Sequence, residues 1–174
     1  MATVRRSRSL AATPQELWAI VGDAHHLPRW WPRVTRVESV DDEGFTQVLQ
    51  PPKGKPVRAD FRVVCSQPPS VRRWAQELAG TPFERILSAA ETEVRLEPEG
   101  ETATTVAISL TQRPRGLALL GGFMVRAAAR RQVDEALEAL EALVTASSAS
   151  APGAPSASPS PGARSGRWPG ARAG

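Results

Sequence analysis

The nonapeptide VRADFRVVC, residues 57–65, alternates between apolar and polar side chains. An extended chain turns successive side chains to opposite faces, so this alternation predicts a β-strand with one buried and one solvated face. A strand of this kind is typical of an antiparallel sheet that packs against a core on one side only. The predicted buried face carries Val57, Ala59, Phe61, Val63 and Cys65, and the solvated face carries Arg58, Asp60 and Arg62.

Similar extended runs lie on both sides of this strand, and short segments rich in turn-forming residues separate them. The separating segments read DDEG, PPKGK, QPPS, AGTP and PEGE, and their Pro, Gly and Asp residues mark turns. We therefore expect a curved antiparallel sheet of about seven strands. The predicted strands cover residues 3–10, 34–41, 45–50, 56–66, 71–79, 83–97 and 102–113.

Two short helices are predicted between the first and second strands. Thr13 can cap the first helix, Pro14 suits its first turn, and Glu16 can complete a capping box. Asp23 can cap the second helix. Only about one turn of that helix is expected, because Pro28 disfavours helical geometry in the residue before it.

A long helix is predicted at residues 116–144, where apolar side chains recur three or four positions apart. Its segment DEALEALEAL consists of strong helix formers. If this helix lies across the concave face of the sheet, every apolar face is buried. The predicted fold class is therefore α+β, with the helix-grip architecture. The recurring apolar positions are Val125, Ala129, Val133, Leu137, Leu140 and Val144.

The last 30 residues, 145–174, consist almost entirely of Ala, Ser, Pro and Gly. This composition cannot bury enough apolar surface to offset the entropy of ordering the chain, so we expect a disordered tail after a folded domain at residues 1–144. Trp168, the one large apolar residue of the tail, is interpreted as a chance residue or, alternatively, as part of a docking motif for a protein partner. The tail carries three arginines and no acidic residue, and so contributes +3 of the formal net charge of +4.

The remainder of the chain is close to neutral, and its basic residues are scattered through the predicted strands. This distribution gives no basis for nucleic-acid binding. The longest apolar run, GLALLGGFMV, is about half the length that spans a bilayer, and no signal-peptide pattern is visible. The single cysteine excludes a disulfide framework and fits a reducing compartment. We expect a cytoplasmic protein without stable membrane insertion, and its scarcity of lysine is typical of GC-rich, actinobacterial-like genomes.

Neither a metal centre nor a covalent catalytic centre is predicted. His25 and His26 are the two histidines of the chain, and in a helix they would point about 100° apart, so they cannot ligate one ion from one side. Cys65 lies in an apolar strand, where a thiol usually serves as packing. We expect the protein to use no metal and no cofactor.

Three segments of the chain resemble the SRPBCC superfamily. They are TPQELWAIVGDAHHLPRWWPRV (13–34), WAQELAGTPFERILSAAETEVRLEPEGE (74–101) and the closing helix, and the resemblance extends over about residues 3–144. This superfamily includes START-type lipid-transfer proteins, the major birch-pollen allergen type and the polyketide cyclase/dehydrase group. The resemblance implies a helix-grip fold with a cavity between sheet and helix that serves in transport, sensing or catalysis.

The side chains expected to line this cavity come from the tryptophan-rich corner, the strands and the closing helix. Trp30 is expected to form a wall, and Trp31 to be more exposed near the mouth. Alternatively, these side chains fill the core and leave a small cavity or none. The predicted lining residues are Trp30, Trp31, Phe61, Val63, Trp74, Gln76, Leu78, Ile108, Leu120, Met124 and Ala128.

The leading functional hypothesis is the binding of a small hydrophobic molecule, such as a polyketide, isoprenoid or lipid-like compound. An alternative is a cofactor-independent polyketide cyclase or dehydratase that uses the same cavity. Its candidates for assisting proton transfer are Gln76, Arg6 or Arg8, and His25 or His26. A further alternative is a non-enzymatic protein-interaction module that works through the tail or a sheet edge.

Overall fold

The computed structural model describes residues 2–116 and 122–149. Strand β1 (Ala2–Leu10) leads into helix α1 (Pro14–Val21), the 3-10 turn η1 (Ala24–His26) and helix α2 (Leu27–Trp30). The strands that follow are β2 (Val34–Glu38), β3 (Gly44–Leu49), β4 (Val57–Gln67), β5 (Val71–Gln76), β6 (Leu87–Glu99) and β7 (Ala103–Pro114). The 3-10 turn η2 (Pro82–Arg85) lies between β5 and β6, and helix α3 (Gly122–Ala149) follows β7.

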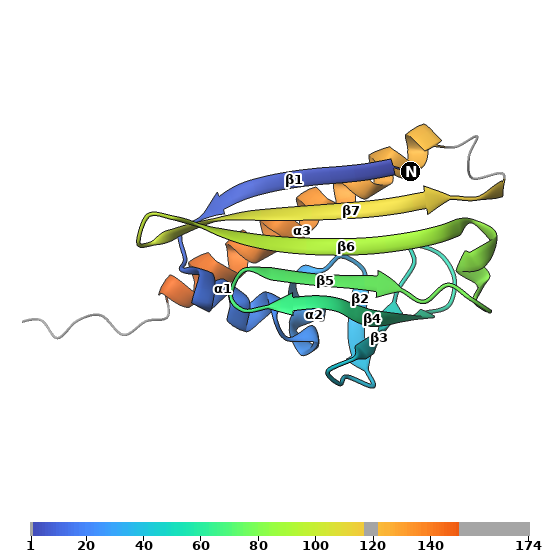
Figure 1. The fold of residues 1–174 in the computed structure, drawn as a ribbon, viewed down its shortest axis with the longest axis horizontal. Coiled ribbons are helices and arrows are strands. Elements are labelled where there is room, and N and C mark those ends of the chain that lie inside the picture. Colours follow the sequence, from blue (N-terminus) through green and yellow to red (C-terminus); the bar gives the residue numbers. More distant parts are fainter. Residues whose placement is uncertain (1, 117–121, 150–174) are drawn as a thin grey trace, which may run out of the picture.

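The seven strands form one antiparallel sheet in the order β1-β7-β6-β5-β4-β3-β2. Strand β1 pairs with β7, so the first and last strands are neighbours, and the two edges of the sheet are formed by β1 and β2. Figure 1 shows the long helix α3 crossing one face of the curved sheet behind β1, β7 and β6. The predicted α+β helix-grip fold is confirmed.

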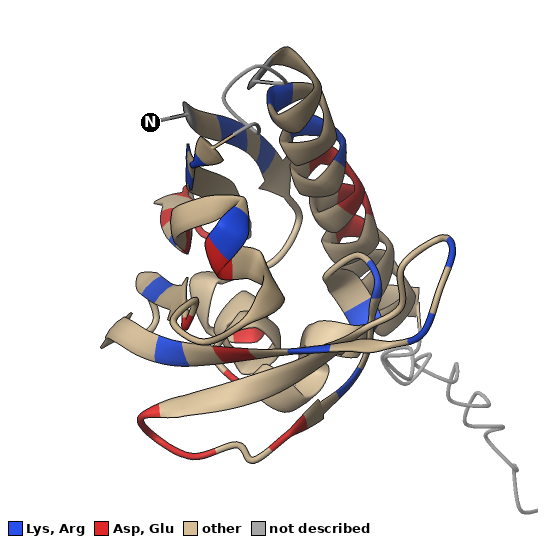
Figure 2. Ribbon diagram, turned by 90° about the vertical axis from the view of Figure 1, so that its right-hand side faces the viewer, with Lys and Arg blue, Asp and Glu red and all other residues tan. Residues whose placement is uncertain are grey.

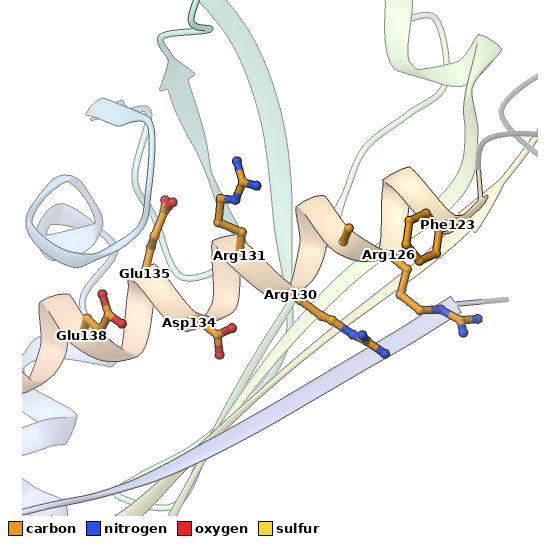
Figure 3. A pocket seen from close by; sticks show the side chains of 8 residues that line it. Phe123, Arg126, Arg130, Arg131, Asp134, Glu135 and Glu138 are labelled. Atoms are coloured by element: carbon orange, nitrogen blue, oxygen red, sulfur yellow. The ribbon is translucent and has the colours of Figure 1, made fainter.

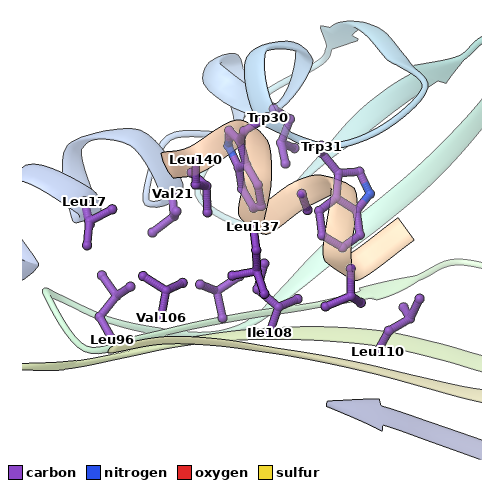
Figure 4. Close-up of a cluster of buried hydrophobic side chains, with 14 of the residues drawn as sticks. Leu17, Val21, Trp30, Trp31, Leu96, Val106, Ile108, Leu110, Leu137 and Leu140 are labelled. Carbon is purple, nitrogen blue, oxygen red and sulfur yellow. The ribbon is translucent and has the colours of Figure 1, made fainter. Parts of the chain in front are cut away.

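A hydrophobic core fills much of the space between the sheet and α3 (Figure 4). Its side chains come from α1, α2, the inner face of the sheet and one face of α3. Burying a Leu, Ile or Val side chain completely stabilises the fold by about 1.5–3 kcal/mol, so these contacts hold the helix on the sheet. The completely buried members of the core include Leu17, Val94, Val106, Ile108, Val133 and Leu140.

Helix α1 begins with the predicted capping box. The backbone N–H of Glu16 donates to Thr13 Oγ1 at 3.3 Å, and the backbone N–H of Thr13 donates to Glu16 Oε2 at 2.7 Å. The hydrogen bonds from the backbone and then from the hydroxyl of Thr13 lower the pKa of the Glu16 carboxyl. A lowered pKa means that this stabilisation is present above the pKa of an unfolded glutamate and is lost as the pH falls through the lowered pKa.

We expect Thr13→Ala to lower the free energy of unfolding by about 1 kcal/mol at neutral pH, because an N-cap acceptor is lost. Urea unfolding of both proteins measures this difference. Part of it should disappear once the pH falls below the lowered pKa of Glu16, since the neutral acid accepts hydrogen bonds less well. The control is Thr145→Ala. The hydroxyl of Thr145 donates to Glu141 O at 2.9 Å within α3, so it does not accept a hydrogen bond at the start of a helix. An equal loss in both variants would contradict the capping role.

The second helical segment is longer than expected. Asp23 caps it as predicted, with Oδ1 accepting from the backbone N–H of His25 at 2.9 Å. The chain then stays helical through Pro28 to Trp30, because Pro28 lies in the first turn of α2, where a missing N–H leaves no intrahelical bond unmade. The prediction that Pro28 ends this segment after one turn is therefore wrong.

Strand β4 contains an irregularity that breaks the predicted alternation. Its register against β5 shifts between Val63, which pairs with Trp74, and Cys65, which pairs with Arg73. Val64 is an extra residue in β4, as in a β-bulge, so the alternation of side chains between the two faces of the sheet shifts by one residue after it. Cys65 therefore shares a face with Arg73, and its predicted place on the face of Val63 is wrong.

Other boundaries also differ from the sequence pattern, and β2 and β5 each end three residues earlier than predicted. Residues 83–86, predicted as the start of a strand, lie in and just after η2, where Pro82 occupies the first turn. Helix α3 continues five residues beyond position 144 to Ala149, and the hydroxyls of Thr145 and Ser148 donate back to carbonyls one turn earlier. The remaining tail, 150–174 with Trp168, lies outside the described residues, so the disordered tail stays a prediction. Within the described ranges, no helix is both long and apolar enough to cross a bilayer.

Candidate functional site

A cavity of about 360 Å³ lies between the sheet and α3. This volume falls within the range of about 300–1,000 Å³ that is usual for small-molecule sites. Strands β3 to β7, the turn after α2, the region of η2 and helix α3 all contribute to its wall. The aromatic and aliphatic lining residues are Trp31, Leu49, Val57, Phe61, Trp74, Phe83, Ile86, Leu87, Ala90 and Leu110. The polar lining residues are Arg33, Gln47, Gln50, Gln76, Thr92, Gln112 and Gln132, and Pro32 and Pro51 complete the wall.

The register of the sheet explains how one part of this wall is built. Ala75 pairs with Glu91, which places the next residue, Gln76, opposite Ala90, and Ala90 in turn pairs with Gln112. The small side chain of Ala90 thus lies between two amide side chains and leaves space in front of the sheet. Gln132 on α3 lines the same cavity from the helix side.

A chain of aromatic contacts connects the core to the cavity. The ring centroids of Trp30 and Trp31 are 5.4 Å apart and those of Trp31 and Trp74 are 6.0 Å apart, both edge to face. Phe45 contacts Trp74 at 6.2 Å and stacks on Phe61 at 5.6 Å. Pairs at these distances add about 0.5–1.5 kcal/mol each beyond area burial, so this wall of the cavity is held firmly in place.

Four of the predicted lining residues line this cavity: Trp31, Phe61, Trp74 and Gln76. Trp30 and Ile108 lie in the hydrophobic core instead, and Leu78 is buried outside the cavity wall. Val63 is partly buried and packs against the core.

The expectation that Trp30 forms a wall of the cavity is wrong, because its neighbour Trp31 takes that place and is only slightly more exposed. Trp31 is 5% exposed, and it is Trp31 that lines the cavity, while Trp30 is 2% exposed and packs in the core. The reason is that α2 ends at Trp30. Trp31 takes an extended conformation, which turns its ring across that of Trp30 and toward Trp74. Figure 4 shows Trp31 on the side of Leu110 and Trp30 beside Leu140.

The predicted lining residues on α3 do not reach the cavity. Met124 is 75% exposed and Ala128 is also exposed, because the inward face of the helix runs through Ala129, Val133 and the residues in phase with them. Leu120 lies outside the described residues.

The opposite, outward face of α3 carries a larger hollow of about 630 Å³. Figure 3 shows that the described lining side chains all project from this one helix, so by themselves they do not enclose a ligand. In Figure 2 the basic residues occupy the N-terminal part of the helix and the acidic ones its middle. The labelled residues of the hollow are Phe123, Arg126, Arg130, Arg131, Asp134, Glu135 and Glu138.

The two arginines considered for proton transfer lie at the edge of the fold, where they pair with acids of α3. Arg6 Nε lies 3.3 Å from Asp134 Oδ1, and Arg8 Nη1 lies 2.6 Å from Glu141 Oε2. All four side chains are at least one third exposed, and exposed pairs of this kind contribute about 0–1 kcal/mol. Neither arginine lines the cavity.

The two histidines also lie away from the cavity wall. The ring of His26 is held at the corner after α1, where Nδ1 lies 2.9 Å from the carbonyl oxygen of Ala19. Since a carbonyl only accepts, Nδ1 carries the proton in this contact. His25 is exposed. Of the candidates for proton transfer, only Gln76 lines the cavity.

A separate hollow beside this corner contains Arg72 together with Asp23 and Asp42. Burial lowers the pKa of the Arg72 guanidinium, and the two carboxylates partly oppose this effect. Arg72 Nη1 donates to Ser66 Oγ at 3.2 Å. In the part of the chain that the structure describes, no three His, Cys, Asp or Glu side chains are grouped to hold a metal ion.

Among the cavity residues that the sequence interpretation missed, the polar ones are mainly glutamines. Gln47, Gln50, Gln112 and Gln132 line the cavity although none of them was predicted to. A signal was present in the pattern: Gln47 lies between Phe45 and Leu49 on the inward positions of β3, and a polar residue at an apolar position is unusual. The described lining residues include one charged side chain, Arg33, and this wall can therefore hydrogen-bond more readily than it can transfer protons.

Comparisons with known proteins agree with this architecture. Residues 1–145 match the family model described as "Polyketide cyclase / dehydrase and lipid transport". The Zhui aromatase/cyclase from a Streptomyces species superposes with a TM-score of 0.74 at 15% identity, covering 88% of this chain and 99% of that one. A START superfamily protein from Mycobacterium smegmatis gives a TM-score of 0.69 at 16% identity, covering 83% and 97%. The di-domain ARO/CYC BexL gives 0.69 at 20%, covering 83% and 47%.

These identities establish the fold and no more than the fold. A comparison with curated proteins finds no match.

Proposed function

Because the chain belongs to the polyketide cyclase / dehydrase and lipid transport family, we propose that it binds a small hydrophobic molecule in the cavity between the sheet and α3. The observation that carries this proposal is the cavity itself, with a volume of about 360 Å³ and a wall to which five strands and helix α3 contribute. Its wall combines aromatic and aliphatic side chains with a few polar groups, which is the usual composition of a small-molecule site.

The electrostatics of the wall favour binding over acid/base catalysis. A general acid or base must lie within hydrogen-bonding reach of the reacting proton, with a pKa near the working pH. Among the described lining residues, Arg33 is the one ionisable side chain, and it is exposed at the rim. The amides of the wall can orient a ligand but do not exchange protons near neutral pH.

The second candidate function is a cofactor-independent cyclase or dehydratase. The similarity to the Zhui aromatase/cyclase favours it, since that protein shares the fold over 88% of this chain. In such an enzyme the wall would act by holding a reactive chain in a folded conformation, because positioning alone lowers the barrier of an intramolecular reaction. Gln76 would be the residue closest to the chemistry.

We expect the purified protein to bind the neutral fluorophore aminoanthracene saturably, at one site per chain. Trp31 and Trp74 line the cavity, so excitation of tryptophan should sensitise the bound dye. Native mass spectrometry of protein purified from its own host should show one small molecule that the dye displaces. An absence of saturable dye binding, with the protein folded by circular dichroism, would count against the proposed function.

A turnover assay separates the two candidates. If a polyketone substrate is cyclised by the wild type, and Gln76→Ala abolishes turnover while dye binding persists, the protein is a cyclase. If dye binding is retained and no polyketone is converted, the binding function stands.

A further inference from the structure

We infer that the cavity selects neutral ligands that carry carbonyl or hydroxyl oxygens, and that Gln47 and Trp74 donate hydrogen bonds to these oxygens. This inference rests on the proposed function and specifies the chemical class of its ligand. On this basis we expect the cavity to bind a neutral oxygenated molecule more tightly than a plain hydrocarbon or a fatty-acid anion.

The first observation is the concentration of amide side chains in the cavity. The chain contains seven glutamines, and five of them line this one cavity, while it contains no asparagine. Gln50 is exposed and its Nε2 donates to Pro51 O at 3.2 Å. An amide both donates and accepts hydrogen bonds, so the other four amides match a ligand with several oxygens. The five residues are Gln47, Gln50, Gln76, Gln112 and Gln132.

The second observation is a buried donor without a protein partner. Gln47 is 1% exposed and lines the cavity, yet its Nε2 has no hydrogen-bond partner among the described residues. Trp74 is 2% exposed, also lines the cavity, and its Nε1 is likewise without a partner there. Leaving a buried donor unpaired is costly, and such groups in native proteins are rare enough to need a reason.

The neighbours of Gln47 show that packing does not require a polar group at this position. On β3 it stands between Phe45 and Leu49, and it pairs with Ala59 on β4. A leucine there would satisfy the apolar surroundings without an unpaired amide. The amide is therefore explained better by a ligand than by the stability of the fold.

Trp30 has the same indole donor as Trp74 but lies outside the cavity wall. Its Nε1 is also buried and has no partner in the described part of the chain. An unpaired indole alone therefore does not mark a ligand contact, and the inference depends on Gln47 together with Gln76, Gln112 and Gln132 around the same space. Trp74 is included because it lines that space and has the same unused donor.

The charge of the wall excludes an anionic ligand head from the interior. The described lining residues contain no buried cation, since Arg33 is exposed at the rim. A carboxylate drawn inside would lose its hydration without gaining an ion pair. A hydrocarbon would enter, but would leave the amides unpaired. A neutral carbonyl or hydroxyl compound avoids both costs.

Three probes with one carbon skeleton test the inference: fluorene, fluorenone and fluorene carboxylate. Each is titrated against the aminoanthracene complex, with wild type, Gln47→Leu and the control Gln15→Leu, whose glutamine is exposed on α1. We expect wild type and Gln15→Leu to bind fluorenone about 5- to 10-fold more tightly than fluorene, as one or two hydrogen bonds to a buried donor would give. Gln47→Leu should lose most of this preference while binding fluorene at least as well.

A second variant keeps the test decisive if Gln47→Leu folds poorly. Trp74→Phe retains the aromatic ring and removes the indole donor, so it should reduce the preference for fluorenone without abolishing the binding of fluorene. Equal binding of fluorene and fluorenone by the wild type, a preference unchanged in both variants, or tightest binding of the carboxylate would overturn the inference and leave the proposed function intact. Failure of all probes and of the dye would overturn both.

Discussion

Replacing Trp30 with alanine should lower the free energy of unfolding by about 3–5 kcal/mol, the usual cost of truncating a fully buried tryptophan. Trp30 is 2% exposed and belongs to the core that holds α3 on the sheet. Its ring contacts Trp31 edge to face at 5.4 Å, so the truncation also removes support from the cavity wall. A loss of this size is a large fraction of the total stability of a single domain. Urea unfolding followed by circular dichroism measures it.

The matched control is Trp18→Ala, which removes the same side chain from a partly buried position beside the core. Because less apolar surface leaves the interior there, its loss of stability should be clearly smaller. At temperatures where Trp30→Ala is folded, it should still bind aminoanthracene, since Trp30 does not line the cavity. A loss below about 1 kcal/mol together with altered dye binding would instead identify Trp30 as a gate and contradict its place in the core.

The architecture was predictable because local rules and tertiary packing agree over most of the chain. Alternation in residues 103–114 and the capping residues Thr13 and Asp23 each lead to the element that forms. The pairing of β1 with β7 then leaves one curved face for α3 to cover. In these segments the local order of apolar and polar residues already predicts which face of the element is buried.

The details that could not be predicted depend on information that is not local. The bulge at Val64 is visible only in the register between β4 and β5, and it turns Cys65 to the other face. Met124 and Ala128 were placed inside from their apolar character, although each lies one residue before a position of the recurring apolar pattern, and it is that pattern, with Val133 and Leu140, that packs. A helical position one residue out of phase is rotated by about 100°.

The cavity wall was only partly predictable for a similar reason. A hydrophobic ligand is expected to contact apolar side chains, and on this basis Trp31, Phe61 and Trp74 were correctly predicted to line the cavity. The same expectation passed over glutamines at inward positions of strands, because a single polar residue in an alternating pattern is readily taken for an edge or a surface position. The missed glutamines, Gln47, Gln50, Gln112 and Gln132, meet Gln76 only in the folded chain.

Replacing Ala90 with phenylalanine should weaken dye binding by about 10- to 100-fold, because the added ring would occupy part of the space that the ligand needs, and a ligand that enters beside it would overpack the site at a cost of about 1–3 kcal/mol. Ala90 is 9% exposed and lies in the cavity wall between Gln76 and Gln112. Its side chain points into empty space of about 360 Å³, so the larger ring can enter without compressing the core. The stability of the free protein should therefore change little or rise. Dye titration and urea unfolding of the same samples measure the two effects.

The control is Ala89→Phe, which places the same ring one residue earlier in β6, on the exposed face of the sheet. Both variants have the same strand, the same increase in side-chain size and the same β-propensity. Any difference in dye binding between them therefore comes from the face of the sheet on which the ring lies. Ala89→Phe should bind the dye like the wild type. If Ala90→Phe instead destabilises the fold by about 1–3 kcal/mol, the space in front of Ala90 is filled with side chains. Unchanged dye binding in Ala90→Phe would place the ligand elsewhere, because a ring at that position cannot share the cavity with a bound molecule.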